Sequence, residues 1–513
     1  MPSKLTFSDY EPVTPGRSAL PSGEHATEEG WPEKKRTLAV ETGPERETAT
    51  ADKMTPEKAK ETTNGVEPSR PTPKRGLKRG HMLSYIGLFL FTVILYFRPQ
   101  ELFDSLAGTQ SLAFWFAVPT LLIFIPSQIA LEGNLTARPR EVHLALLLLL
   151  AALLSMPFAL SPADAWEEFN HAFWKAVLMF IVIVNVVRTE GRLKGLMLLG
   201  IAVGCFLSIG AINDYRAGRF LIAGQRVLGV VGGMFGNPND LALHLVTMIP
   251  LAFGLFLSTR RIVLKPLYAA CMLLMVGGVV ATFSRGGFLG LLGACLVFTW
   301  KLGRRNRGVV IGLLVVLIVV IFLFAPGEYA SRLGSITAPG GDASSASRRD
   351  LLLRSILVAL RHPLLGIGMG NFSIVAQRES VSHNAYTQVA AEMGMAATLI
   401  YVLFMVFPLK GLRLMAKATS DTRRESRIYY MSIALQASLV AYMISSFFGS
   451  VAYQYYVYYL VGYAVALRRI YEAQTGTQLI ETSRKARRLP AASRRAGDSL
   501  DLPELESRPA MRA

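Results

Sequence analysis

The chain has 513 residues, of which 51% are hydrophobic and only 18% are charged, and its mean hydropathy is +0.36. Soluble domains carry about 25% charged residues, so the composition excludes a soluble globular enzyme. Residues 1–82 hold 14 Lys or Arg and 13 Asp or Glu, residues 468–513 hold 10 and 6, and the 385 residues between them hold 30 and 17. We therefore expect a membrane domain at 83–467 between two polar tails, 1–82 and 468–513.

The net charge of +18 does not indicate nucleic-acid binding. The membrane domain contributes +13 of it (30 minus 17), and the basic residues lie in short loops between apolar runs. Such loops are typical of the cytoplasmic side of a membrane protein. The three cysteines, Cys205, Cys271 and Cys295, lie inside apolar runs, so no disulfide framework or zinc spacing is predicted.

The N-terminal tail is rich in Pro, Glu, Thr, Lys and Ser and has no apolar periodicity, which predicts disorder. The first apolar stretch begins only near Leu83, so no signal peptide is expected. Lys74, Arg75, Lys78 and Arg79 precede it and favour a cytoplasmic N-terminus. The C-terminal tail, 468–513, is likewise predicted to be disordered.

The middle of the chain predicts an all-α, polytopic bundle of transmembrane helices. A helix needs about 20 residues to cross the hydrocarbon layer, so the shorter runs are expected to extend into their polar flanks. About twelve apolar spans occur, at 83–97, 112–129, 143–160, 171–187, 193–212, 239–257, 263–283, 285–302, 309–324, 384–407, 429–448 and 451–467.

The basic residues of the loops predict the orientation. With the N-terminus inside, the cytoplasmic loops hold 18 Lys or Arg and the short outer loops hold five. The positive-inside rule therefore favours two cytoplasmic termini. It also places the long loop 325–383, between spans nine and ten, in the periplasm. The segment RRDLLLRSILVALRHP in this loop predicts a helix on the membrane surface, with Leu352, Ile356 and Leu360 on one face, that ends before Pro363.

Two outer segments carry an arginine beside glycines. In 224–244, Asn237 and Pro238 can begin a helix and Asp240 suits its positive end. Capping explains the NPND sequence but not Arg226, which lies among glycines that let a backbone approach a ligand. In FSRGG, 283–287, a tight hairpin holds Arg285 at the membrane edge, as a ligand contact or as a snorkelling side chain.

Two further outer segments surround the long loop. Arg348 and Arg349 begin its predicted helix; arginine suits a diphosphate, although a solvated or lipid-binding pair is the alternative. His383 begins the tenth span, where histidine can accept a proton, and Asn384 either binds substrate or simply caps the helix. No phosphate-binding G-x-x-x-x-G-K-[ST] loop and no metal-ligand spacing occur, and GIGMGNF at 366–372 is a loop signal.

Together these segments resemble the O-antigen ligase and polymerase family of bacterial membrane glycosyltransferases. The similar motifs are NPND at 237–240, SRGG at 284–287, HPLLGIGMGNF at 362–372 and HN at 383–384. The family's Arg-x3-Leu pattern matches Arg348 to Leu352, and its His-x10-Gly pattern matches His383 to Gly394. Arg349 to Leu353 also fits the first pattern. Arg348 is preferred because it lies fourteen residues before His362 (362 minus 348), as in the family.

The resemblance implies a metal-independent glycosyltransferase without a cofactor, in the bacterial inner membrane. Its donor is a glycan on a polyprenyl diphosphate, usually undecaprenyl diphosphate, and its acceptor is a glycan or a lipid. Preorganised cations stabilise the negative charge of a leaving diphosphate, and the acceptor hydroxyl needs a base. The site residues so implied are the catalytic His383, Arg348 and Arg285 and the substrate-binding Arg226, Asn237, Asn239, Asn384 and Arg349.

Two other functional classes fit part of the sequence. A transporter or flippase for lipid-linked sugars has about as many spans, but such proteins often show two related halves and midplane charges. Neither feature is found here, which favours the transferase. A sensor or scaffold acting through its polar tails is the third hypothesis. Within the transferase hypothesis, joining a glycan to lipid A core, polymerising repeat units and glycosylating a protein all remain open.

Overall fold

The computed structural model describes residues 80–102, 112–219, 233–303, 343–376, 381–420 and 427–479, with the isolated residues 77, 227, 231, 308, 311, 312 and 315. The chain divides into two units, Met1–Ser69 and Arg70–Ala513, and every described residue belongs to the second. The disorder predicted for 1–82 and 468–513 therefore falls mostly outside the described residues. Arg226 also lies outside them.

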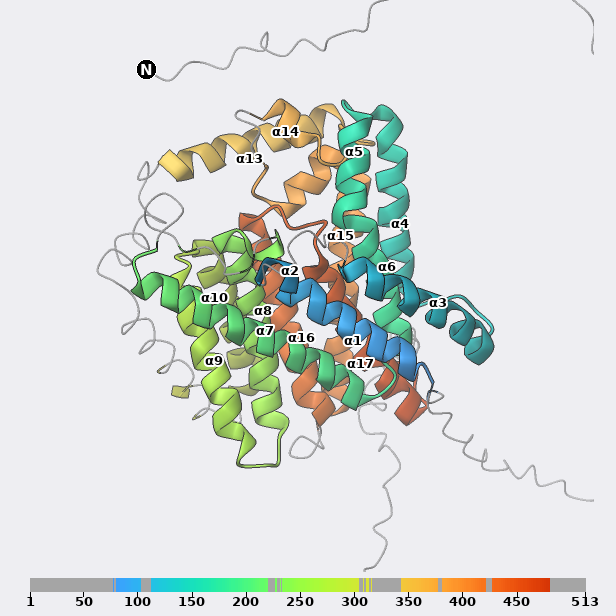
Figure 1. Cartoon of the computed structure of the whole chain (residues 1–513), viewed down its shortest axis with the longest axis vertical. Coiled ribbons are helices and arrows are strands. Elements are labelled where there is room, and N and C mark those ends of the chain that lie inside the picture. Colours follow the sequence, from blue (N-terminus) through green and yellow to red (C-terminus); the bar gives the residue numbers. More distant parts are fainter. Residues whose placement is uncertain are drawn as a thin grey trace, which may run out of the picture. The chain divides into compact units, whose positions relative to one another are not determined.

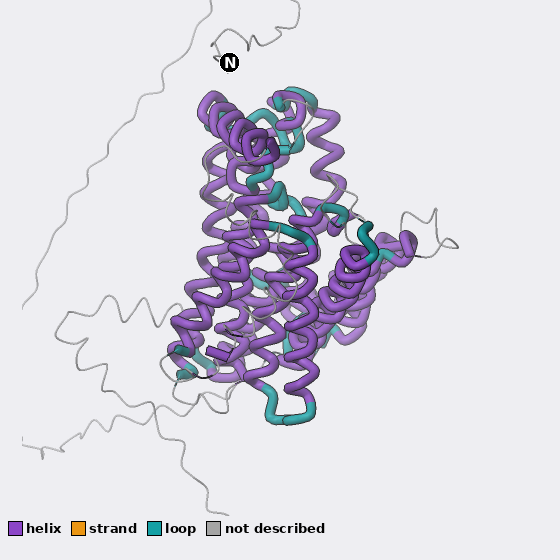
Figure 2. The backbone as a smooth tube through the Cα atoms, turned by 90° about the vertical axis from the view of Figure 1, so that its left-hand side faces the viewer, coloured by secondary structure: helices purple, strands orange, loops and turns teal. Residues whose placement is uncertain are grey.

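All regular elements of the described residues are helices, which confirms the all-α prediction (Figure 2). In chain order they are α1 (Met82–Phe97), α2 (Pro99–Leu102), α3 (Leu112–Glu132), α4 (Arg140–Ser155), η2 (Met156–Phe158), α5 (Pro162–Glu168), the π-helix η3 (Phe169–Phe173), α6 (Trp174–Val186), α7 (Glu190–Arg216), η4 (Gly233–Phe235), α8 (Pro238–Ser258), α9 (Leu264–Ala281), α10 (Arg285–Leu302), α13 (Ala343–Arg361), α14 (Phe372–Val375), α15 (Ala385–Ala418), α16 (Arg427–Ser445), η6 (Ser446–Phe448) and α17 (Tyr455–Thr475).

The described part of the chain contains nine helices that are long and apolar enough to cross a membrane. They correspond to nine of the twelve predicted spans, so the chain is a multi-pass membrane protein. The predicted eighth and twelfth spans form α10 and α17, which are not among the nine. The ninth, 309–324, falls largely outside the described residues. The total of twelve spans therefore stays a prediction.

Helix α8 lies at the centre of the bundle and is the most buried of the nine candidate spans. It packs against α7, α9, α10 and α16. Small residues permit this close packing: a Cβ atom added to Gly254 of α8 would lie 2.4 Å from the Cβ of Ala434 in α16. The packing of the core consequently holds the ends of α8, α10 and α16 in defined positions relative to one another.

The predicted boundary between the membrane domain and the C-terminal tail falls inside α17, which continues to Thr475. Arg468, near this end, is buried rather than solvated. Arg468 forms two hydrogen bonds to the Glu141 carboxylate of α4, at 2.7 and 2.8 Å, and both side chains are at most 5% exposed. Such a paired charge holds α17 against α4 in one register.

The helix predicted in the long loop is α13, and it ends at Arg361, directly before His362-Pro363, as predicted. It lies across one end of the bundle, beside α14 (Figure 1). Its buried face consists of Leu351, Ser355 and Ala359. Two of the three residues predicted to form its apolar face, Ile356 and Leu360, are exposed. Helix α13 thus packs through one face onto α15 and leaves an apolar face open.

Candidate functional site

The NPND motif forms the start of α8. Asn237 has extended backbone angles, and its side-chain oxygen accepts a hydrogen bond from the Asn239 backbone N–H at 2.9 Å. Pro238 occupies the first helical position, where its missing N–H costs nothing. Asp240 lies in the first turn. The capping prediction is therefore confirmed, and Asn239 is left to point into the protein, where it is only 8% exposed.

The SRGG motif forms the start of α10 and is joined to the NPND motif. The Ser284 hydroxyl accepts a hydrogen bond from the Gly287 backbone N–H at 3.2 Å, and it donates one to the Asn239 side-chain oxygen at 3.0 Å. Both side chains are buried. Arg285 is the first residue of α10 and therefore directly follows Ser284, which forms these two hydrogen bonds. The two motifs, 44 residues apart between Asp240 and Ser284, act as one structural unit.

The glycines of the SRGG motif permit two close contacts. A Cβ atom on Gly286 would lie 2.6 Å from the Cβ of Phe448, and one on Gly287 would lie 2.7 Å from the Cβ of Ala242. The Ser445 hydroxyl also donates a hydrogen bond to the Gly286 carbonyl oxygen at 3.0 Å. The backbone that carries Arg285 is therefore held between α8 and the end of α16.

The HN motif forms the start of α15. The Asn384 side-chain oxygen accepts hydrogen bonds from the backbone N–H groups of Tyr386 and Thr387, at 2.9 and 3.1 Å, so this asparagine caps the helix. His383 precedes the cap with φ at 53°, a conformation that non-glycine residues rarely adopt. Its backbone N–H donates to the Ser450 hydroxyl at 2.9 Å. The backbone of His383 is thus held by a residue from the far end of the sequence.

Residues 446–450, between α16 and α17, contact all three motifs, and no sequence motif pointed to them. Phe448 lies against Gly286, Ser450 accepts the hydrogen bond from His383, and a Cβ atom on Gly449 would lie 3.5 Å from the Asp240 carboxylate. Their one sequence signal is position, because they include the end of the predicted span 429–448 and the two residues before the span 451–467. We call this stretch the 446–450 segment.

Arg348 approaches the site from α13. It is half-buried, whereas its neighbour Arg349 is exposed. Burial, followed by the nearby positive charge of Arg285, lowers the pKa of Arg348 below its usual value. The positive charge of Arg285 thus acts on Arg348, although 63 residues separate the two in sequence (348 minus 285). The preference for Arg348 over Arg349 as the site arginine stays a prediction.

The HPLLGIGMGNF motif attaches α13 to α15. Helix α15 is broken at Gly394, which has φ at 87°. The Met395 N–H donates to the Pro363 carbonyl oxygen at 2.8 Å, and the Ile367 N–H donates to the Ala391 carbonyl oxygen at 2.9 Å. The break exposes backbone groups of α15, and the glycine-rich loop satisfies them. The His383-to-Gly394 spacing in the sequence therefore corresponds to the first part of α15, which runs from the site to this attachment.

Replacing Gly394 with alanine is expected to loosen the attachment of α13. A Cβ atom there would lie 2.3 Å from the Leu364 carbonyl oxygen, in addition to the strain of the positive φ. Such strain costs about 1–3 kcal/mol, and the clash adds to it. We expect a lower midpoint of thermal unfolding and faster proteolysis at α13. Gly133→Ala is the matched control, because Gly133 has φ at 69° but no atom within 4 Å of an added Cβ. Equal losses in both variants would show that the contact with Leu364 is unimportant.

Glu392 is a second group that the sequence did not assign. It is 3% exposed, and its carboxylate accepts a hydrogen bond from the Tyr453 hydroxyl at 2.7 Å. The contact with Tyr453 accounts for one of its oxygens. Because Tyr453 follows the 446–450 segment, this bond secures that segment against α15.

The described residues contain no group of three or more His, Cys, Asp or Glu side chains placed to hold a metal ion. The independence from metal that the sequence predicts is a statement about the reaction and stays a prediction.

Residues 270–402 match the O-antigen ligase family model. The matched region contains Arg285, Arg348 and His383, together with the glycine-rich loop and Gly394. No curated protein matches the chain. The match confirms the resemblance that the motifs carry, and it supports a role in glycan transfer at a membrane. The chain is thus a multi-pass membrane protein in which residues 270–402 are similar to the O-antigen ligase family.

Proposed function

We propose that this protein transfers a glycan from undecaprenyl diphosphate to an acceptor hydroxyl at the outer face of the bacterial inner membrane, in O-antigen or exopolysaccharide assembly. One observation carries the proposal: the starts of α8, α10 and α15 meet at the 446–450 segment, and the positive charge of Arg285 acts on Arg348. Under the proposed orientation, this end of the bundle faces the periplasm and both termini are cytoplasmic.

The electrostatics of this end favour a departing diphosphate. The N-terminal ends of α8, α10 and α15 each carry a partial positive charge of about half a unit, and two guanidinium groups add full charges. Arg285 and Arg348 repel each other when the site is empty. An anion between them removes that repulsion. Since the diphosphate gains negative charge as its bond to the sugar breaks, the stabilisation is greatest in the transition state.

His383 is the proposed base. Its imidazole takes the proton of the acceptor hydroxyl while the acceptor oxygen bonds to the anomeric carbon and the bond from that carbon to the diphosphate breaks. Attack opposite the leaving group inverts the anomeric configuration. The hydrogen bond from the His383 backbone to Ser450 supports this role, because it holds the backbone that carries the imidazole in a conformation that non-glycine residues rarely adopt.

The neighbouring arginines of α13 provide an internal comparison. Arg348→Ala is expected to reduce transfer by about 10²–10³-fold, the usual cost of losing one preorganised donor. Arg349→Ala is expected to be milder, because Arg349 is exposed. Both variants are compared with the native protein in an assay with purified enzyme and a polyprenyl-diphosphate donor. A dead Arg349→Ala beside an active Arg348→Ala would reverse the register and leave the proposed chemistry in place.

A further inference from the structure

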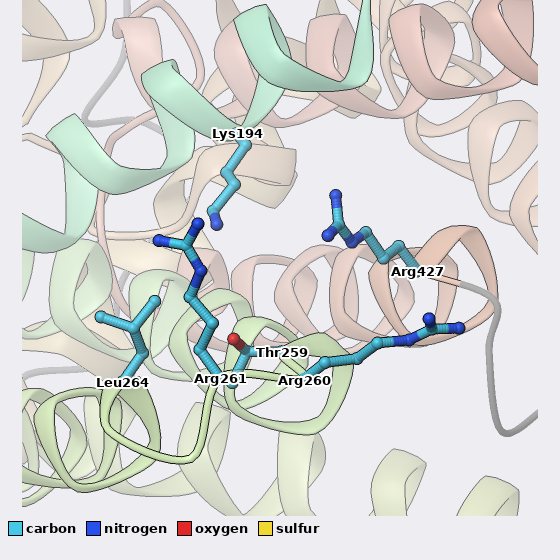
Figure 3. Close-up of a pocket in the computed structure, with 6 residues that line it drawn as sticks. All are labelled: Lys194, Thr259, Arg260, Arg261, Leu264 and Arg427. Atoms are coloured by element: carbon cyan, nitrogen blue, oxygen red, sulfur yellow. The ribbon is translucent and has the colours of Figure 1, made fainter.

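A basic pocket lies away from the proposed site, at the other end of α8. It has a volume of about 390 Å³. The side chains that line it are Lys194, Thr259, Arg260, Arg261, Leu264 and Arg427 (Figure 3). They come from four separate elements, namely the first turns of α7, the turn between α8 and α9, the start of α9, and the start of α16.

The pocket and the proposed site lie at opposite ends of helix α8, which is long and apolar enough to cross a membrane. Helix α8 begins at the site with Pro238 and ends at Ser258, directly before the lining residue Thr259. Its 21 residues span about 32 Å, which matches the hydrocarbon thickness of about 30 Å. A ligand of this pocket is therefore distinct from the glycan donor and acceptor.

The pocket concentrates positive charge. Four of its six lining residues are Lys or Arg, and no carboxylate is among them. Figure 3 shows Lys194, Arg261 and Arg427 extending toward a common space. The charges of Arg427 and Arg261 both act on the Lys194 ammonium group. Holding like charges together is unfavourable, and an anion in the shared space turns this repulsion into attraction.

The surface beside the pocket is apolar. Ile262 is 78% exposed, Val263 is 84% exposed and Leu267 is 56% exposed, and all three follow the paired arginines of the turn between α8 and α9. Exposed apolar residues next to a cationic site fit a ligand that has an anionic head and hydrocarbon chains. Inorganic phosphate has no hydrocarbon chain that could contact these apolar side chains.

We propose that this pocket binds the phosphate headgroup of an anionic phospholipid in the leaflet opposite the proposed transfer site. The guanidinium groups of Arg261 and Arg427 pair with phosphate oxygens through two N–H donors each, and the Thr259 hydroxyl supplies a neutral donor. Ile262 and Val263 lie along the acyl chains. The bound lipid links α7, α8, α9 and α16 at the end of the bundle away from the site.

The test compares two triple variants of the full-length protein. The first variant combines Lys194→Gln, Arg261→Gln and Arg427→Gln, which removes three positive charges from the pocket. Lys410→Gln, Arg413→Gln and Lys417→Gln remove three exposed charges near the end of α15, at the same end of the bundle but outside the pocket. Binding of phosphatidylglycerol is measured by native mass spectrometry after purification in a neutral detergent. We expect the pocket variant to lose about 10- to 100-fold in affinity and the control less than about threefold. Equal affinities of the two triple variants would overturn the proposal.

Two further measurements separate a lipid from free phosphate. Ile262→Ser with Val263→Ser is expected to weaken phosphatidylglycerol binding, and inorganic phosphate is expected to leave the thermal unfolding of the native protein unchanged. Two results together would overturn the lipid as the occupant. Inorganic phosphate would raise the midpoint of thermal unfolding of the native protein but not of the pocket variant, and the Ile262→Ser, Val263→Ser variant would bind phosphatidylglycerol as well as the native protein does.

Discussion

Replacing His383 with alanine is expected to slow glycan transfer by about 10²–10⁴-fold, the usual worth of a positioned proton acceptor. The acceptor hydroxyl keeps its proton in this variant, so attack on the anomeric carbon is hindered. Donor binding is expected to stay largely intact, because the cations that hold the diphosphate are on α10 and α13. The fold is expected to survive, since the Asn384 cap and the backbone contact with Ser450 do not use the imidazole.

The measurement is the rate of product formation by the purified variant at saturating donor, together with a separate measurement of donor affinity. His171→Ala is the matched control, because this exposed histidine lies in η3, outside the three converging motifs. A His383→Ala enzyme with a near-native rate would remove His383 from the chemistry. A variant that fails to bind the donor would instead assign His383 to the diphosphate.

Replacing Arg285 with lysine is expected to lower transfer by about 10²–10³-fold, although the positive charge is kept. Lysine presents a point charge where arginine presents a planar fork that pairs with two phosphate oxygens. The start of α10 is expected to form as before, because its cap is the Ser284 hydroxyl and its close contacts are made by Gly286 and Gly287.

Arg98→Lys is the control for this exchange. Arg98 pairs with Glu101 at 2.8 Å, and both side chains are partly exposed, so the substitution is expected to change little. The rate of transfer and the thermal midpoint are measured for both variants. Full activity in Arg285→Lys would show that charge alone is sufficient there, and the proposed paired hydrogen bonds would be wrong.

The helix starts at the site were predictable from sequence. Asn237, Ser284 and Asn384 are all residues that accept hydrogen bonds from the first turn of a helix, and each begins the helix expected after it. Local chemistry decides such positions, so no knowledge of distant contacts is needed. The end of α13 before Pro363 was predictable for the same reason.

The assembly of the site was not predictable from local patterns. The 446–450 segment contains no residue type that indicates its role, and its importance lies in contacts with Gly286, His383 and Asp240. The buried face of α13 depends on which neighbour it meets, and helical periodicity does not choose between neighbours. A pairing between residues far apart in sequence becomes visible only in three dimensions.

The charged end of α17 shows the same limit. Composition assigned Arg468 to the polar tail, because a charge after an apolar run usually marks its end. The structure buries this arginine against Glu141, which lies 327 residues earlier in the chain. A charged side chain can be buried when an oppositely charged partner forms hydrogen bonds with it. No residue near Arg468 in the sequence indicates that its partner is Glu141.

The most direct test of the account is transfer by the purified protein from a glycan–undecaprenyl diphosphate donor, with a chelator present and without ATP. The account predicts that the glycan appears on the acceptor in inverted configuration, that one undecaprenyl diphosphate is released for each glycan transferred, and that Arg285→Lys and His383→Ala both suppress the reaction. Near-native rates in both variants would contradict the proposed site, and a requirement for a divalent metal would contradict the arginine mechanism.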